Sequence, residues 1–451
     1  MKILRIDLLI DSMFPREKKL PSLLLLSFIF LLASVNCQPG FNNPADPSSL
    51  AFFKTNLVST YLKSLIKDAE LVEAEVPQFL ALLYLKSGPN EVGIKVWNVD
   101  PDTGKLTSTI GMQAIPPNAP GNSPVNLKRV PKSRELFASS GFGSPSTFNK
   151  IYSFKIQDDG SVTVIGSSPS GILPNTVTPN ISGTNVYATI TSSTTNVYLY
   201  QKDTSGNLTQ STLSSYPFGT YCSPSSLLVS QTERNIFITN PSYLSIYQQD
   251  TSAGTVTIGS GSPLPIAASP TLNDNLTLHP TRNYIYTTIA NIAAPIAGFI
   301  YNQDSTASAI QGSPFTPSGS YSATTSSTKT LTIDPYGRFI AFVYSDASGN
   351  RLQLLKINSS TGALTPSGFP IGVGNAPGDL TWDESGRFIY FFSDTGAASS
   401  EKQLEVYKVS STGELTSTPG SPVILGTISS FSPRGIVSVT KTMKVKPGEY
   451  P

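Results

Sequence analysis

Cysteine and histidine are scarce in this chain of 451 residues, which has two cysteines and one histidine. Two cysteines allow at most one disulfide, so the fold is not a small disulfide-stapled scaffold. The sequence also lacks the paired-cysteine spacings of zinc sites, the G-x-S-x-G turn of serine hydrolases and a phosphate-binding glycine loop. We therefore expect no metal site and no cofactor, and these patterns identify no catalytic residues.

Charged residues are also few, at 13% of the chain against 39% apolar residues. This apolar content is too high for a disordered chain. The formal net charge is +2, and the first 37 residues account for it, so the rest of the sequence is neutral. A neutral chain without basic runs argues against nucleic acid as a partner, because binding to it depends on phosphate neutralisation.

No hydrophobic run is long enough to cross a membrane, which takes about 20 residues. The longest apolar run covers residues 23–33 and follows the basic patch Arg16–Lys19. A basic patch before a short apolar run is typical of a secretory signal, which we place at residues 1–37. Met13 is a second candidate for the true start, since a signal counted from there has the usual length.

The apolar run leads to Cys37, and this ending resembles a bacterial lipoprotein signal, in which the cysteine becomes the lipidated first residue. Lipidation of Cys37 would make a membrane the partner of the mature protein, held by the acyl chains. The resemblance implies a cell-envelope location, at the outer membrane or surface rather than the cytoplasmic membrane. The alternative is a plain secretory signal cut between Ala33 and Cys37.

Residues 38–75 are predicted to form a tether followed by a short amphipathic helix. Apolar residues recur at three- and four-residue spacing after Asp46, which suits a helix N-cap. These residues are Leu50, Phe53, Leu57, Tyr61, Leu62 and Leu65. The helix would pack on the following domain as a strap, or it would lie on a membrane or a partner.

A repeat fills residues 76–442, with a tail at 443–451. Its clearest copies, Leu331–Thr365 and Leu380–Thr416, each contain short strands of alternating apolar character, separated by Asp/Gly/Ser turns. Seven such copies of about 50 residues predict an all-β, seven-bladed β-propeller built from four-stranded antiparallel blades. The first copy lacks its opening strand. We therefore expect the strand around Gly435–Val439 to complete the first blade and close the ring.

The repeat motifs are similar to those of lactonase-type seven-bladed propellers related to 6-phosphogluconolactonase. They are the GSP segments at residues 261–263, 312–314 and 420–422, and the turns Asp334–Phe339 and Asp383–Phe388. The resemblance implies the fold and offers lactone hydrolysis as an activity, for which the family uses a His with Arg and Glu near the central channel. His279 does not match that histidine, because the repeat aligns it with Asp334 and Asp383 in a structural turn.

A ligand is expected where the loops entering the innermost strands converge. A small molecule, a glycan or a protein would bind there. The polar candidates on these loops are Asn126, Asn175, Asp274, Tyr321, Lys329 and Asp379. The sequence thus favours an exported, lipid-anchored binding or scaffold module of the bacterial envelope over an enzyme. Lactone hydrolysis is the alternative.

Overall fold

A computed structural model describes the chain from Val72 to Val445 with gaps. The described ranges are residues 72–86, 91–108, 113–114, 123–141, 150–170, 174–190, 196–211, 216–217, 226–239, 243–250, 255–266, 275–289, 295–318, 330–346, 348–396, 401–427 and 432–445. The predicted signal, Cys37 and the predicted helix lie outside these residues. Within them the secondary structure is entirely β, in seven antiparallel sheets.

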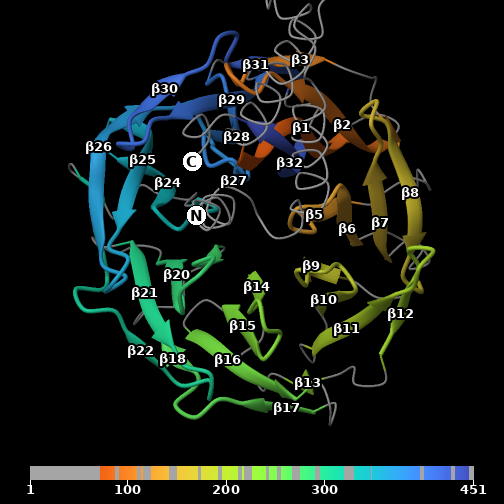
Figure 1. Ribbon diagram of the computed structural model, residues 1–451, viewed down its shortest axis with the longest axis vertical. Coiled ribbons are helices and arrows are strands. Elements are labelled where there is room, and N and C mark those ends of the chain that lie inside the picture. Colours follow the sequence, from red (N-terminus) through yellow and green to blue (C-terminus); the bar gives the residue numbers. More distant parts are fainter. Residues whose placement is uncertain are drawn as a thin grey trace, which may run out of the picture. The chain divides into compact units, whose positions relative to one another are not determined.

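The seven sheets surround a central axis, with the innermost strands near the axis and the outer strands at the rim (Figure 1). The innermost strands are β32 (Ser432–Val445), β5 (Ser123–Arg129), β9 (Pro174–Pro179), β14 (Ser226–Val229), β19 (Leu276–Leu278), β23 (Thr330–Ile333) and β27 (Leu380–Trp382). The second strands are β1 (Val72–Lys86), β6 (Glu135–Gly141), β10 (Asn185–Ile190), β15 (Asn235–Thr239), β20 (Tyr284–Thr288), β24 (Phe339–Asp346) and β28 (Phe388–Asp394).

The third and fourth strands complete each blade. The third strands are β2 (Glu91–Val99), β7 (Lys150–Ile156), β11 (Asn196–Lys202), β16 (Tyr243–Asp250), β21 (Ile296–Tyr301), β25 (Gly349–Ile357) and β29 (Glu401–Val409). The outer strands are β3 (Leu106–Ser108), β8 (Val162–Ser167), β12 (Leu208–Gln210), β17 (Thr255–Ile258), β22 (Ala307–Ala309), β26 (Leu364–Gly372) and β30 (Leu415–Ser417). Short segments also pair with four of the third strands: β4 (Gln113–Ala114), β13 (Tyr216–Pro217), β18 (Leu264–Pro265) and β31 (Val423–Thr427). The predicted seven-bladed propeller is confirmed.

The last strand of the chain closes the ring, as predicted. The first blade has the order β3-β2-β1-β32, so its innermost strand comes from the C-terminal end. β32 pairs with β1 along its length, from Val72 opposite Val445 to Leu85 opposite Ser432. The first and last parts of the propeller therefore share one sheet, and neither end of the ring is left with an unpaired inner edge.

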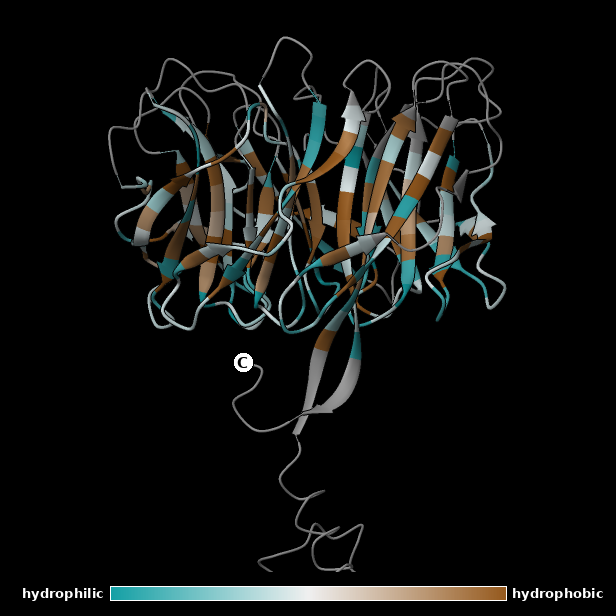
Figure 2. Ribbon diagram, turned by 90° about the horizontal axis from the view of Figure 1, so that it is seen from above, coloured by the Kyte–Doolittle hydropathy of each residue, from teal (hydrophilic) through white to brown (hydrophobic). Residues whose placement is uncertain are grey.

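Alternate residues of each second strand face opposite neighbours, so the core is a series of layers between blades. In β1, one set of alternate residues packs against the blade of β5–β8, and the other set packs against the blade of β27–β30. The first set is Phe79, Ala81 and Leu83, and the second is Leu80, Leu82 and Tyr84. Apolar residues fill the strands while polar ones gather at their ends (Figure 2). A strand with both faces buried explains the near-continuous apolar runs of the repeat.

The repeated turn motif is a backbone-binding device. An oxygen of Asp383 accepts the N–H groups of Arg387 at 2.9 Å and Phe388 at 2.7 Å, and Gly386 in the same turn has φ of 63°. Asp334 makes the same bonds to its own turn. The motif D-x-x-G-R-F therefore positions the hairpin between the first and second strands, where an aspartate can satisfy two backbone donors at once.

The serine of each GSP motif makes a hydrogen bond to the third strand of its blade. The hydroxyls of Ser262, Ser313 and Ser421 accept the N–H groups of Ile246, Gly298 and Val406 at distances of 2.9, 3.0 and 2.9 Å. These bonds satisfy backbone N–H groups of the third strand at the point where the short outer strand no longer pairs with it. An unpaired buried N–H would cost free energy, so the serine is structurally required there.

A half-buried carboxylate links the blades where the ring closes. Glu384, in the turn after β27, pairs with Arg129 at the end of β5. The oxygen that pairs with Arg129 also accepts the N–H of Lys132 at 2.9 Å, and the other oxygen accepts the hydroxyl of Thr440 on β32 at 2.8 Å. One side chain thus links the last blade, the closing strand and the second blade. We call this set of contacts the seam clasp.

We expect Glu384→Gln to lower the free energy of unfolding by roughly 2–3 kcal/mol, because it leaves the guanidinium of Arg129 buried without its counter-charge. Denaturant titration measures this change. The matched control is Asp158→Asn, which removes an ion pair with Arg134 at a carboxylate that is 93% exposed. An exposed pair contributes about 0–1 kcal/mol. Equal effects of the two substitutions would contradict a special role for the seam clasp.

Candidate functional site in the central channel

One shared register position of the innermost strands lines the central channel in five of the seven blades. In six blades the turn after the innermost strand begins at a residue whose N–H bonds the carbonyl five residues later, which fixes a common register. The residue four positions before that turn is polar in all six blades: Asn126, Thr176, Ser226, Asn275, Thr330 and Asp379. In the blade that closes the ring, Gly435 takes the corresponding place opposite Leu83. We call this set the entry ring.

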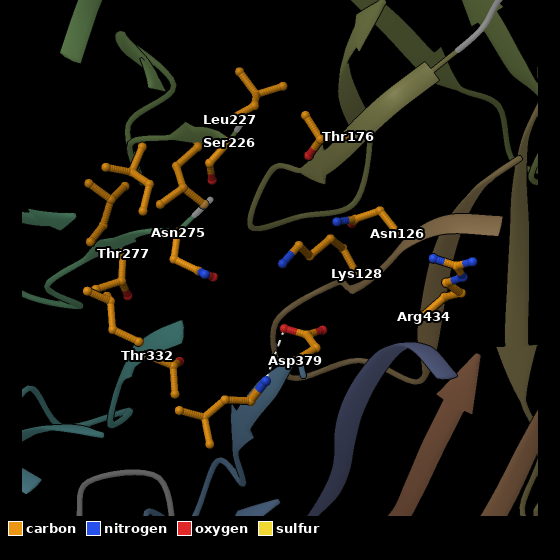
Figure 3. A pocket seen from close by; sticks show the side chains of 15 residues that line it. Asn126, Lys128, Thr176, Ser226, Leu227, Asn275, Thr277, Thr332, Asp379 and Arg434 are labelled. Atoms are coloured by element: carbon orange, nitrogen blue, oxygen red, sulfur yellow. Dashed lines mark hydrogen bonds between the residues drawn. The ribbon is translucent and has the colours of Figure 1, made fainter. Parts of the chain in front are cut away.

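A cavity of about 390 Å³ lies within this ring. Its polar lining residues are Asn126, Lys128, Thr176, Ser226, Asn275, Thr277, Thr332, Asp379 and Arg434. The side chains of Asn126, Lys128, Asn275 and Asp379 point into one common space (Figure 3). Because every blade contributes, the site exists only when the ring is closed.

The charges of the cavity gather around the ring closure. Asp379 precedes β27 and Lys128 lies on β5, so these residues belong to the two blades that flank β32. Gly435 lies between them and carries no side chain. A Cβ at Gly435 would come within 2.8 Å of the Cβ of Leu127, so β5 packs directly against β32. This close approach brings a cation and a carboxylate to one side of the channel, with Arg434 near them.

Burial raises the pKa of the Asp379 carboxyl above its usual value, while the charge of Lys128 and two backbone donors oppose this shift. The donors are the N–H groups of Leu380, at 3.1 Å, and Ile436, at 3.3 Å. Both distances exceed the usual length of a hydrogen bond to a charged acceptor. The carboxylate is therefore held in place and only partly compensated.

Asn126 contributes an acceptor that its surroundings leave unused. Its Oδ1 is buried and has no hydrogen-bond donor within the residues that the structure describes. Across the channel, the Oδ1 of Asn275 accepts the hydroxyl of Thr330 at 3.3 Å. A buried acceptor without a donor costs free energy, so the Asn126 amide is suited to accept a hydrogen bond from a ligand.

Of the six residues predicted from the sequence to bind a ligand, the structure describes the side chains of only two. Asn126 and Asp379 both line the cavity. Asn175 lies on β9, but its side chain is outside the described part, as are Asp274, Tyr321 and Lys329 altogether. Ligand binding by any of the six stays a prediction. Lys128, Asn275 and Arg434 also line the cavity and are not among the predicted residues. Counting back four residues from each aligned turn identifies Asn275, whereas no sequence motif marks Lys128 or Arg434.

His279 lies in the turn after β19, where the repeat alignment places it, and is 6% exposed. Its Nδ1 accepts the N–H groups of Thr281 and Arg282 at 3.2 and 3.1 Å, and its Nε2 lies 3.1 Å from the carbonyl oxygen of Gly337. Burial lowers its pKa, which favours the neutral ring with the proton on Nε2. Its Nδ1 thus accepts backbone donors of its own turn, as the carboxylates of Asp334 and Asp383 do, although the donors lie at different positions of the turn.

Two kinds of feature are absent from the described ranges. No helix there is long and apolar enough to cross a membrane. No group of three or more His, Cys, Asp or Glu side chains in the described ranges is arranged to hold a metal ion.

A family model described as "Lactonase, 7-bladed beta-propeller" matches residues 90–219. The predicted resemblance to lactonase-type propellers is therefore confirmed, although the match covers the early blades rather than the later ones, where the motifs are clearest. No protein with a curated description is significantly similar to the chain.

Solved structures with the same fold are numerous. A putative 6-phosphogluconolactonase from Bacteroides uniformis has a TM-score of 0.62 and 16% identity, covering 81% of this chain and 99% of its own. The periplasmic gluconolactonase of Pseudomonas aeruginosa has a TM-score of 0.60 and 15% identity, with 80% and 99% covered. A putative 6-phosphogluconolactonase from Bacteroides fragilis has a TM-score of 0.60 and 14% identity, with 80% and 98% covered. Identities this low support a shared fold alone.

Replacing Asp379 by Asn tests the electrostatics of the channel. A raised pKa in the folded state means that wild type loses stability as the pH rises from about 4, since the unfolded carboxyl ionises first. Asp379→Asn lacks this loss, so its stability relative to wild type should increase between pH 4 and pH 7. Denaturant titrations across that range measure the difference.

Asp304→Asn is the control for this test. Hydrogen bonds from Thr306 lower the pKa of the exposed Asp304 carboxyl, so its removal should give a pH dependence of the opposite sign. Parallel pH profiles for Asp379→Asn and wild type would show that the carboxylate of Asp379 carries no cost in the folded protein.

Proposed function

We propose that the protein is an exported binding module whose central channel holds a small, hydroxylated anion. The observation that carries this proposal is the charge of the cavity, where Lys128 and Arg434 accompany a single carboxylate, Asp379. A ligand with one negative charge would compensate the excess cation. The cavity volume of about 390 Å³ falls in the range of small-molecule sites and favours such a ligand over a protein.

The remaining lining explains why the ligand should carry hydroxyl groups. Asn126, Ser226, Asn275 and Thr332 offer both donors and acceptors around the channel. The buried Oδ1 of Asn126 requires a donor, which a carboxylate or phosphate alone cannot supply. A hydroxyl group donates and accepts, so a polyhydroxylated acid satisfies the amides and the cations together.

The location proposed for this module is the bacterial envelope, with Cys37 as the lipidated residue. The support comes from the sequence: the basic patch, the apolar run of residues 23–33 and the cysteine that follows it. An anchored propeller would collect its ligand outside the cytoplasm. The membrane would be the outer membrane or the cell surface.

Lactone hydrolysis is the second candidate. It is favoured by the match to the lactonase family model and by the presence of Asp379 and Lys128 in one cavity. A carboxylate with a raised pKa is suited to act as a general base, and an ammonium group stabilises an oxyanion. Against it stands the absence of the histidine that the family uses, since His279 serves a turn.

Lys128→Met separates a charge-dependent site from a merely polar channel. We expect purified protein to bind gluconate and not glucose, which has similar hydroxyl groups without the charge. The substitution should weaken gluconate binding by about 10- to 100-fold, because it removes one charge-assisted hydrogen bond. Isothermal titration calorimetry measures both ligands.

Lys155→Met is the matched control, because Lys155 is exposed on β7 and does not line the cavity. Equal binding of gluconate and glucose, or gluconate binding that Lys128→Met leaves unchanged, would contradict the binding proposal. Hydrolysis of gluconolactone above the buffer rate that Asp379→Asn abolishes would establish the second candidate instead.

Lipidation is tested in cells of a lipoprotein-processing bacterium. We expect the protein to incorporate labelled palmitate, with processing blocked by globomycin, and Cys37→Ser to remove both effects. Cys222→Ser is the control, since it changes the other cysteine and should leave labelling intact. A wild-type protein that is secreted without label would contradict the anchor and leave the plain secretory signal.

A further inference from the structure

The segment that leads into Asp379 is attached by backbone hydrogen bonds to the two neighbouring blades that it connects. It joins β26 to β27 and covers residues 372–379, all of which the structure describes. Backbone hydrogen bonds tie it to β25 and to the end of β28: Val373 N–H to Asn350 O at 3.1 Å, Asn375 N–H to Asp394 O at 2.8 Å, Asp394 N–H to Asn375 O at 2.6 Å and Gly378 N–H to Phe392 O at 2.8 Å. We call it the entry segment.

The side chain of Glu405 on β29 holds the entry segment in place by a hydrogen bond. Its side chain is almost fully buried, at 5% exposure. One carboxylate oxygen accepts the N–H of Gly374 at 2.8 Å and the hydroxyl of Ser393, and the other accepts the hydroxyl of Tyr407 at 2.9 Å. A buried carboxylate is costly unless donors surround it, and here the backbone of the entry segment supplies one of them.

Two glycines allow the entry segment to lie this close. A Cβ at Gly374 would come within 2.3 Å of the hydroxyl of Ser393, and a Cβ at Gly378 within 1.8 Å of the ring of Phe392. The segment therefore packs against the blade with no side chain between them. Asp379 follows directly, so its position depends on how the segment is held.

We infer that Glu405 is a positioning residue for the channel site. Through its bond to Gly374, it fixes the entry segment in the arrangement that presents the carboxylate of Asp379 to the cavity opposite Lys128. The consequence for ligand affinity rests on the proposed function. The positioning of Asp379 does not, so the two can be tested separately.

The test compares Glu405→Leu with Glu405→Gln by two readouts that use no ligand. The first is hydrogen exchange of residues 372–380, and the second is the titration of Asp379 by carboxyl-carbon NMR, assigned with Asp379→Asn. Leucine fills the space without an acceptor, so exchange of the segment should become about tenfold faster. The pKa of Asp379 should fall towards its usual value as water reaches it. Glutamine keeps an oxygen for Gly374 and should stay within twofold of wild type.

Ser421→Ala is the control for a merely structural role. Ser421 bonds the N–H of Val406 on the same strand as Glu405 and does not touch the entry segment. It should lower the stability of the blade while leaving the Asp379 titration unchanged. If Glu405→Leu fails to fold, Gly374→Ala displaces the segment independently and should give the same two shifts.

The inference is overturned if the Asp379 titration and the exchange of residues 372–380 in Glu405→Leu, or in Gly374→Ala, match those in Ser421→Ala. Gluconate calorimetry on the same variants then addresses the proposed function. If the titration shifts and wild type does not bind gluconate, the positioning role stands and the binding proposal fails. If both hold, Glu405→Leu should weaken gluconate binding and Glu405→Gln should restore it.

Discussion

Each blade of this protein has two buried faces and therefore depends on two neighbours. The alternation in β1, with Phe79 towards one neighbour and Leu80 towards the other, leaves neither face for solvent. A row of such units would expose an apolar face at each end, so the chain has to form a ring. The composite first blade, in which β32 completes β1, joins the two ends by backbone hydrogen bonds.

Closing the ring also creates the site. The innermost strands meet around the axis, so one shared register position faces the same cavity in five of the seven blades. Most blades place a neutral polar residue there, such as Thr176 or Ser226. The exceptions lie around the closing strand: Asp379 on one side, Gly435 in the strand itself, and Lys128 two residues beyond Asn126 on the other side. The chemistry of the channel thus comes from departures from the repeat.

The sequence predicts what the repeat encodes. The number of blades, the displaced closing strand and the turn role of His279 all follow from aligned copies, because every copy solves the same packing problem. Asn126 and Asp379 are found because the repeat predicts loops that end at these residues, although the structure places Asn126 inside β5. Lys128 and Arg434 carry no motif and lie more than half the chain apart. Their proximity arises only when β5 packs beside β32, which no local pattern reveals.

The repeat also separates structural carboxylates from functional ones. Asp383 is fully buried, but Asp334 occupies the same place in the preceding blade and makes the same turn bonds, so the fold explains both. Asp379 has no charged counterpart in the entry ring, because the other blades have uncharged residues, such as Thr330 or Asn275, at the same position. Its backbone bonds are long and its pKa is raised by burial, so it weakens the fold at neutral pH. In the proposed complex, hydroxyl groups of the ligand would donate to this carboxylate, while the ligand's own charge would pair with Lys128 and Arg434.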